Sequence, residues 1–384
     1  LQIYHDGSHS YVKDAGTGDL YLQGSSAIRF TDPTQSENFA VFNHNGAVNL
    51  YHDSSLKFQT LSTGINVIGT AVTDGLTVAG NVSVNGGSIK LDGNYPVGTD
   101  NVALGNTALD SNVSGVRVTA IGADALTANT ASDNTAIGAR AMASTTSGAN
   151  NVAVGRDSMF TNSTGAENVS VGLNTMYYNT TGANNTALGR SALQANTTAS
   201  NNTGLGYQSL LANTTGAGNS AVGKTTLQSN TTGANNTAVG LQALNGNTTA
   251  ADNTAVGMNA LVTNTTGASN TAVGRSALQE NTTASNNTAV GYHAGYSNTT
   301  GAYNTFLGDI AGRDNTTGSA NTAVGYGSMF EGTTTGTSNT AVGSVSMQNL
   351  SSGSYNVAIG TDSLKSNTTA SFNTAVGKSA LGAN

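Results

Sequence analysis

The sequence has no cysteine, no tryptophan and only two prolines, Pro33 and Pro96. The absence of cysteine excludes disulfides, iron–sulfur clusters and zinc sites with thiolate ligands. Charged residues make up 9% of the chain, against about 25% in a typical soluble protein. The formal net charge is −7 and the chain has no stripe of basic residues, so we expect no nucleic-acid partner.

Long apolar runs are also missing. No stretch of about 18 or more apolar residues occurs, and we therefore expect no membrane insertion. Disorder would require a higher net charge or a lower apolar content than the 37% found here. With 49 glycines, the composition favours a regular structure that needs little core per residue, such as a solenoid. The chain starts at Leu1 and ends at Asn384 within a repeat pattern, which indicates a piece of a longer protein.

A 17-residue repeat fills most of the chain. Each unit contains a glycine that closes a string such as Asn-Thr-Ala-Val-Gly, and the spacing is 17 except for one 16 and one 18. We call this residue the repeat glycine. The seventeen repeat glycines are Gly105, Gly122, Gly138, Gly155, Gly172, Gly189, Gly206, Gly223, Gly240, Gly257, Gly274, Gly291, Gly308, Gly325, Gly343, Gly360 and Gly377.

The residues before the repeat glycine alternate with a period of two. Valine, leucine or isoleucine comes directly before it, and the residue two before it is almost always alanine. Asparagine lies four before it in sixteen of the seventeen units. This alternation predicts a short β-strand, with Thr237 and Val239 on one face and Ala238 on the other.

The residues after the repeat glycine predict a second short strand with one core residue, leucine or methionine, followed by an Asn-Thr-Thr-Gly turn. Stacked units would bury the valine and leucine columns, and asparagine ladders would bond turn to turn. About seventeen turns would give a rod of roughly 80 Å. The core residues expected in the central units are Val239, Leu244, Val256, Leu261, Val273 and Leu278.

One thin coil of this kind has a small core. We therefore expect copies of the chain to associate side by side, with the column of Ala238 equivalents at or near the contact. The alternative is that these alanines fill a tight interior within a single chain.

The string Asn-Val-Ala-Val-Gly at residues 151–155 resembles the head repeats of trimeric autotransporter adhesins. The resemblance covers about residues 97–384, although the units here are longer. It implies a left-handed parallel β-roll with three chains around one axis, and hence a homotrimer.

Residues 1–22 and 61–82 are similar to segments of tail-fibre proteins of marine bacteriophages, in which such modules lie in a trimeric shaft. Together the two resemblances imply an extracellular fibre, on a virion or a cell surface, that contacts a bacterial surface.

Residues 1–95 lack the repeat, and we expect a β-rich shaft region there, followed by the solenoid at 96–384. Short strands are expected at 3–4, 20–22, 40–42, 48–51, 65–68, 76–78, 82–84 and 89–91.

No constellation of catalytic residues stands out, and we expect no enzyme and no cofactor. The glycine-rich strings are periodic, so they indicate turns rather than phosphate-binding loops. His5 and His9 with Asp6 could ligate a metal if a symmetry axis brought copies together, but surface turns are the preferred interpretation.

One segment departs from the repeat. Gly295 and Gly312 replace the leucine or methionine in two successive units, and Phe306 between them occupies a position that is alanine in most units. We expect Phe306 to fill the volume that the two glycines leave.

Aromatic residues crowd the same segment, at Tyr292, His293, Tyr296 and Tyr303. The alternative interpretation is that these four form a shallow patch that binds a sugar.

The sequence therefore predicts an all-β structural fibre protein that serves in attachment, as a phage tail fibre or the stalk of a surface adhesin. A second hypothesis is an adhesin that binds a bacterial surface glycan or receptor along its shaft. A third is an ice-binding solenoid that uses threonine columns such as Thr231 and Thr232.

Overall fold

The computed structural model describes residues 1–68 and 99–383, and the chain divides into two compact units, residues 1–89 and 90–384. The expected boundary at 95/96 and the strands expected at 76–78, 82–84 and 89–91 lie outside the described residues. The described residues form twenty-four strands and no helix, so no helix there could cross a membrane.

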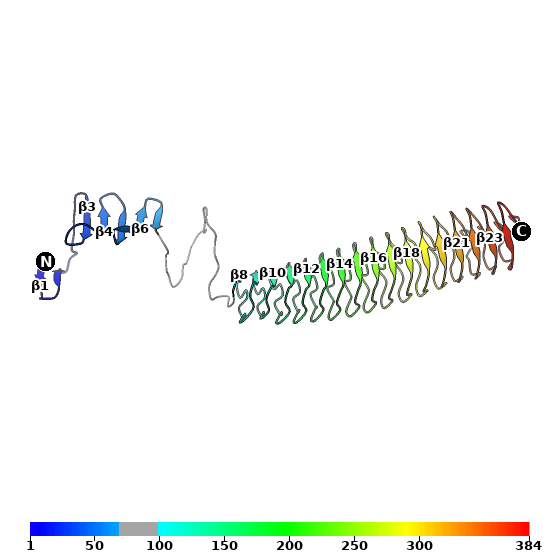
Figure 1. Ribbon diagram of the computed structural model, residues 1–384, viewed down its shortest axis with the longest axis horizontal. Helices are drawn as coiled ribbons and strands as arrows, with labels where there is room; N and C mark the ends of the chain where they lie inside the picture. Colours follow the sequence, from blue (N-terminus) through cyan, green and yellow to red (C-terminus); the bar gives the residue numbers. More distant parts are fainter. Residues whose placement is uncertain (69–98, 384) are drawn as a thin grey trace. The chain divides into compact units, whose positions relative to one another are not determined.

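The first unit contains a hairpin and a five-stranded antiparallel sheet in which consecutive strands are neighbours (Figure 1). Residues 20–22, expected as a strand, are not in one. The strands are β1 Gln2–His5 and β2 Ser10–Lys13 in the hairpin, then β3 Ala27–Thr31, β4 Asn38–Asn43, β5 Val48–His52, β6 Ser55–Leu61 and β7 Gly64–Val67 in the sheet.

The second unit is a stack of seventeen parallel three-residue strands, which confirms the predicted β-solenoid (Figure 1). Each strand pairs with the next along the chain, so Thr237, Ala238 and Val239 lie beside Thr254, Ala255 and Val256. These strands are β8 Val102–Leu104, β9 Thr119–Ile121, β10 Thr135–Ile137, β11 Val152–Val154, β12 Val169–Val171, β13 Thr186–Leu188, β14 Thr203–Leu205, β15 Ser220–Val222, β16 Thr237–Val239, β17 Thr254–Val256, β18 Thr271–Val273, β19 Thr288–Val290, β20 Thr305–Leu307, β21 Thr322–Val324, β22 Thr340–Val342, β23 Val357–Ile359 and β24 Thr374–Val376.

The second strand that we expected in each unit is absent from the described rungs. Residues 241–246 form turns instead, and both Gln242 and Leu244 have left-handed backbones, with φ of 59° and 51°. A leucine in this conformation costs roughly 1–2 kcal/mol. The stack offsets this cost because the Leu244 amide donates a hydrogen bond to the Ala260 carbonyl of the next rung, at 3.0 Å, and its side chain is buried.

Two ladders of buried asparagines hold the rungs in register. In the first, Asn230 Nδ2 donates to Asn213 Oδ1 of the preceding rung at 2.8 Å and to the Gly233 carbonyl at 2.9 Å. In the second, the Asn236 amide N–H donates to Asn219 Oδ1 at 3.0 Å. Among residues 99–383, Asn202 Nδ2 has no partner, but the other buried side-chain nitrogens of the ladders are bonded, so the interior accepts them at little cost.

The repeat glycine is required by the close approach of neighbouring rungs. Gly240 has φ of 131°, and a Cβ atom there would lie 2.6 Å from the Gly257 carbonyl oxygen. We expect Gly240→Ala to lower the stability of the rod locally by about 2–3 kcal/mol or more, because of backbone strain and this overlap. Hydrogen exchange of the amides in β16 and β17 measures the effect.

Gly204→Ala provides the matched control. Gly204 occupies the strand position that is alanine in most rungs, and a Cβ atom there would meet first a flexible side-chain atom, Ser209 Oγ, at 3.1 Å. We expect this change to be neutral or slightly stabilising. Equal exchange rates in the two variants would contradict the role given to the repeat glycine.

Candidate functional site

The interior of one coil consists of small residues and one large side chain per rung. Ala238, Ala243 and Leu244 are fully buried, as are Leu261 and Leu278. The three leucines therefore lie in the core as expected. The alanines fill the interior of a single chain, as the alternative interpretation had it, so Ala238 itself has no exposed surface for a contact between chains.

The valines expected in the core lie outside it. Val239 and Val256 are 38% and 36% exposed, and Val273 is half-buried. Placing them inside the coil was wrong because the narrow interior has room for the alanine methyl opposite Leu244, but not for a second large side chain. Valine and threonine therefore point outward.

We call the outward-pointing first and third residues of β8 to β24 the outer sheet face. Its third-residue column is valine, leucine or isoleucine in all seventeen rungs. Nine members of this column are 36–68% exposed, and the others are half-buried. The nine are Leu104, Ile137, Leu188, Val222, Val239, Val256, Leu307, Ile359 and Val376.

The five-stranded sheet of the first unit also has an uncovered apolar face. Register and alternation place Ile28, Phe30, Phe42, Leu50 and Phe58 on one side of it. Phe30, Phe42 and Leu50 are 42–50% exposed. Among residues 1–68, the only buried apolar side chain is that of Val41, which lies on the opposite side.

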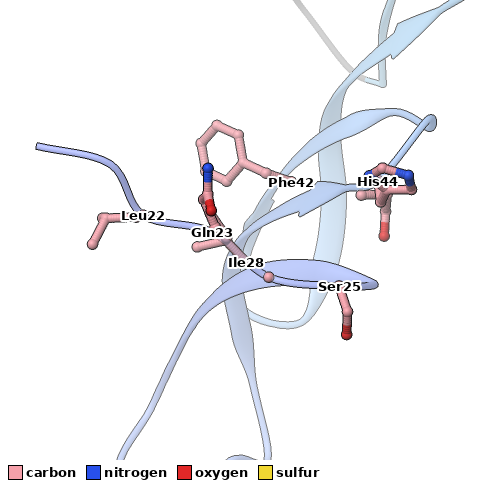
Figure 2. Close-up of a pocket in the computed structure, with 8 residues that line it drawn as sticks. Leu22, Gln23, Ser25, Ile28, Phe42 and His44 are labelled. Carbon is pink, nitrogen blue, oxygen red and sulfur yellow. The ribbon is translucent and has the colours of Figure 1, made fainter. Parts of the chain in front are cut away.

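A hollow of ≈ 530 Å³ opens at the edge of this apolar face. Leu22, Ile28 and Phe42 line it together with His44, and Figure 2 shows Leu22 and Phe42 on either side of Gln23. Its lining is mixed, because Gln23, Ser25, Asn43 and His44 join the three apolar side chains, so it does not have the mostly apolar wall of a typical ligand pocket.

The expected aromatic patch is assembled in part. The rings of Tyr292 and His293 stack with centroids 3.9 Å apart, and His293 lies 4.8 Å from Tyr296. Gln279 Nε2 donates a hydrogen bond to Tyr296 Oη at 3.0 Å. Tyr303 does not join them, since it lies five residues before its repeat glycine while the other three follow theirs.

Burial lowers the pKa of His293, and the positive charges of Arg275 and Arg313 lower it further, against the opposing effect of Asp309. A histidine with a lowered pKa is neutral at pH 7. The patch therefore has an uncharged imidazole at its centre.

A second aromatic cluster lies on the same edge of the rod and was missed. Phe160 and Tyr177, in successive rungs, stack with centroids 5.1 Å apart. Arg140 lies over Phe160 at 5.5 Å and is paired with Asp157, whose Oδ2 accepts a hydrogen bond from Arg140 Nη2 at 2.9 Å. The separation of 17 between Phe160 and Tyr177 was the available signal.

The threonine columns proposed for ice binding differ in what they expose. The Thr231 hydroxyl donates to the Thr248 carbonyl of the next rung at 3.0 Å, and Thr231 is half-buried. The neighbouring column, from Thr164 through Thr232 to Thr317, is exposed at ten successive rungs. One of the two hydroxyls per rung is thus engaged by the backbone.

The histidines near the N-terminus belong to a turn. Asp6 Oδ1 accepts hydrogen bonds from the backbone amides of Ser8 and His9, at 2.9 and 2.8 Å, and these bonds lower the pKa of Asp6. His9 lies edge-on to Tyr11. Within residues 1–68 and 99–383, no three potential metal ligands gather in one place.

The described residues thus offer three exposed surfaces and no enclosed reaction site: the outer sheet face, the apolar side of the first sheet, and the aromatic edge of the rod. Comparisons with protein-family models, curated proteins and solved structures find no match.

Proposed function

We propose that the protein is a structural subunit of a multi-chain fibre that serves in attachment to a bacterial or cell surface. The observation that supports this most strongly is the outer sheet face, with its apolar column running from β8 to β24. Apolar patches of this extent on a protein surface mark sites of association.

The burial pattern separates this column from the core of the single chain. Ala238 and Leu244 already fill the interior of their rung, so Val239 is not needed to close it. A column that is apolar in every rung but lies outside the core is suited to packing against an equally long and regular partner. Another copy of the rod has the same rung spacing and the same apolar column.

The first unit supports association independently. Within residues 1–68, no second layer covers the apolar face of the sheet, and stable domains pack at least two layers. Phe30, Phe42 and Leu50 would lie in a core only if another layer covered them.

Three copies are proposed because the adhesin heads that residues 97–384 resemble are trimers, with each coil left-handed. The resemblance of residues 1–22 and 61–82 to tail-fibre segments favours an extracellular place on a virion, with a cell-surface stalk as the alternative.

The oligomeric state tests the proposal. We expect light scattering of the full chain to give three chain masses, and small-angle scattering to give an elongated particle. Lysine at Val239, Val256 and Val273 should convert the trimer to smaller species, because three charges would be placed in each copy of an apolar contact.

Lysine at Thr232, Thr249 and Thr266 is the control, since these exposed residues lie on a different edge. This variant should remain trimeric. A wild-type monomer with full β-sheet circular dichroism would contradict the proposal, as would a trimer that the valine substitutions leave intact.

A further inference from the structure

One edge of the rod differs from rung to rung, while the rest of each rung repeats. We call the residues one, two, five and six positions after each repeat glycine the variable edge. Asparagine, alanine and glycine elsewhere in the unit are fixed by the ladders and the core. Eight of the nine lysines and arginines in residues 99–383 lie on this edge: Arg140, Arg156, Arg190, Lys224, Arg275, Arg313, Lys365 and Lys378.

Within the variable edge, Tyr292, Asp309 and Tyr326 occupy the same position in three consecutive rungs. Backbone hydrogen bonds fix this column: the Ile310 amide donates to the Tyr292 carbonyl at 2.8 Å, and the Gly327 amide to the Asp309 carbonyl at 3.1 Å. Tyr292 and Tyr326 are 44% and 57% exposed, and Asp309 is exposed. We call these three residues the tyrosine strip.

The spacing of the strip suits a polymer with a two-unit repeat. Adjacent rungs of a parallel stack are about 4.8 Å apart, so the two tyrosines are separated by roughly 10 Å along the rod. The disaccharide repeat of an extended 1,4-linked polysaccharide has nearly the same length. One sugar ring could then contact each tyrosine, with Asp309 accepting hydrogen bonds from the hydroxyls of the sugar between them.

Neighbouring side chains order Tyr292 and the surface beside the strip. His293 stacks on Tyr292, and the Arg275 guanidinium of the preceding rung lies 5.8 Å from the Tyr292 ring centre. On the next rungs, Arg313 lies 4.3 Å from the ring centre of Phe330 and is paired with Asp314 at 2.8 Å. Side chains that are already ordered lose less entropy when a ligand binds.

The charges around the strip are not net positive. Arg275 and Arg313 are opposed by Asp309, Asp314 and Glu331, and His293 is neutral at pH 7 because its pKa is lowered. A polyanion would find no net positive potential here. An uncharged chain with many hydroxyls fits the mixture of aromatic, guanidinium and carboxylate groups better.

We propose that Tyr292, Asp309 and Tyr326 bind an extended, uncharged 1,4-linked polysaccharide that lies along the rod. This inference rests on the proposed role in attachment and names the class of surface ligand. Of the expected patch, the strip contains only Tyr292, on which His293 stacks. It leaves out Tyr296 and Tyr303 and adds Asp309 and Tyr326.

Affinity electrophoresis of the full chain tests it, in native gels containing hydroxyethylcellulose, glycol chitin or dextran. The first two polymers are 1,4-linked and extended, and they distinguish glucose from N-acetylglucosamine as the sugar. Dextran is 1,6-linked and lacks the required repeat. We expect retardation by at least one of the first two and none by dextran.

Tyr292→Ala and Tyr326→Ala should each weaken binding about tenfold or more, as loss of a central aromatic contact usually does. Tyr326→Phe should bind like the wild type, because it keeps the ring. Tyr207→Ala is the matched control: Tyr207 lies in the same column, but Leu173 and Leu241 occupy the positions two rungs away. This variant should bind normally.

Absence of retardation of the wild type in both 1,4-linked polymers would overturn the inference. So would equal losses in Tyr207→Ala and Tyr292→Ala. The oligomeric state is measured separately, so the two proposals can fail independently. If the wild type is a trimer but is not retarded, only the polysaccharide proposal is contradicted. If it is a monomer that is retarded, and Tyr292→Ala loses that retardation, only the proposal of a trimer is contradicted.

Discussion

Replacing Phe306 with alanine is expected to lower the local free energy of unfolding by about 3–5 kcal/mol, although alanine is the usual residue at this position. Phe306 is fully buried between Ala289 of β19 and Ala323 of β21. A Cβ atom at Gly295 would lie 2.5 Å from Phe306 Cδ2, and one at Gly312 would meet the other edge of the ring. The ring therefore fills the space that two glycines leave, and alanine would open a cavity.

The measurement is hydrogen exchange of amides in β19 to β21, with β12 to β14 as an internal reference. A local probe is needed because a stack of repeats loses stability rung by rung rather than all at once. Adding leucine at both Gly295 and Gly312 to the Phe306→Ala chain should restore protection, since it recreates the ordinary rung. Leucine at Gly295 alone, with Phe306 kept, should destabilise by overpacking. Unchanged protection in Phe306→Ala would refute the compensation.

Replacing Asn230 with aspartate is expected to destabilise the neighbouring rungs by about 3–5 kcal/mol at pH 7, the cost of an uncompensated buried charge. The substitution keeps the shape of the side chain. It removes the Nδ2 donor that bonds Asn213 Oδ1 and the Gly233 carbonyl, and it places a carboxylate against those two oxygens. Hydrogen exchange in β15 to β17 measures the loss.

The dependence on pH separates charge from shape in this variant. Burial raises the folded-state pKa of the new carboxyl above its unfolded value of about 3.9, because the oxygens of Asn213 and Gly233 face it and only Asn247 Nδ2 still donates to it. The folded state then binds the proton more readily, so the penalty grows as the pH rises above about 4 and is smaller at pH 4 than at pH 7. Asn230→Leu is the control.

Leucine already occupies the equivalent ladder position at Leu350, where it is fully buried. Asn230→Leu should cost about 1–3 kcal/mol through unsatisfied partners, with no dependence on pH. A penalty in Asn230→Asp that does not change between pH 4 and pH 7 would contradict the role of charge.

The repeat predicted the stack of strands because a unit of fixed length can bury apolar residues only against its neighbours. The alternation did not reveal which face of the strand points inward, since Ala238 and Val239 are both apolar. Thr237, on the same face as Val239, was the available clue, because its hydroxyl favours the outside. The side chain of Leu244 occupies most of the interior, so only the small Ala238, and not Val239, can point inward.

The turn after the repeat glycine could not be predicted from residue preference. Leucine rarely adopts a positive φ, yet Leu244 and its equivalents do so because the bond to the next rung requires it. In the first unit, β2, β3 and β6 were missed, although Ile28-Arg29-Phe30 and Leu56-Lys57-Phe58 alternate apolar and polar residues as a strand with one covered face does.

The aromatic patch could have been located more accurately from the sequence. Tyr292, His293 and Tyr296 follow Gly291 by one, two and five residues, whereas Tyr303 precedes Gly308 by five. Position within the unit, rather than distance along the chain, determines which side chains share an edge. Tyr326 is 34 residues from Tyr292 and yet shares its column.

Two units of unusual length leave the strand pairing unchanged. The pairs Thr119 with Thr135 and Thr322 with Thr340 keep their register, although 16 and 18 residues separate them. Gain or loss of one residue is therefore absorbed in the turns, and gain or loss of a whole unit would leave every remaining contact as it is. Duplication or deletion of a repeat unit in the gene would therefore lengthen or shorten the rod by one rung, and the packing of its interior would not have to change.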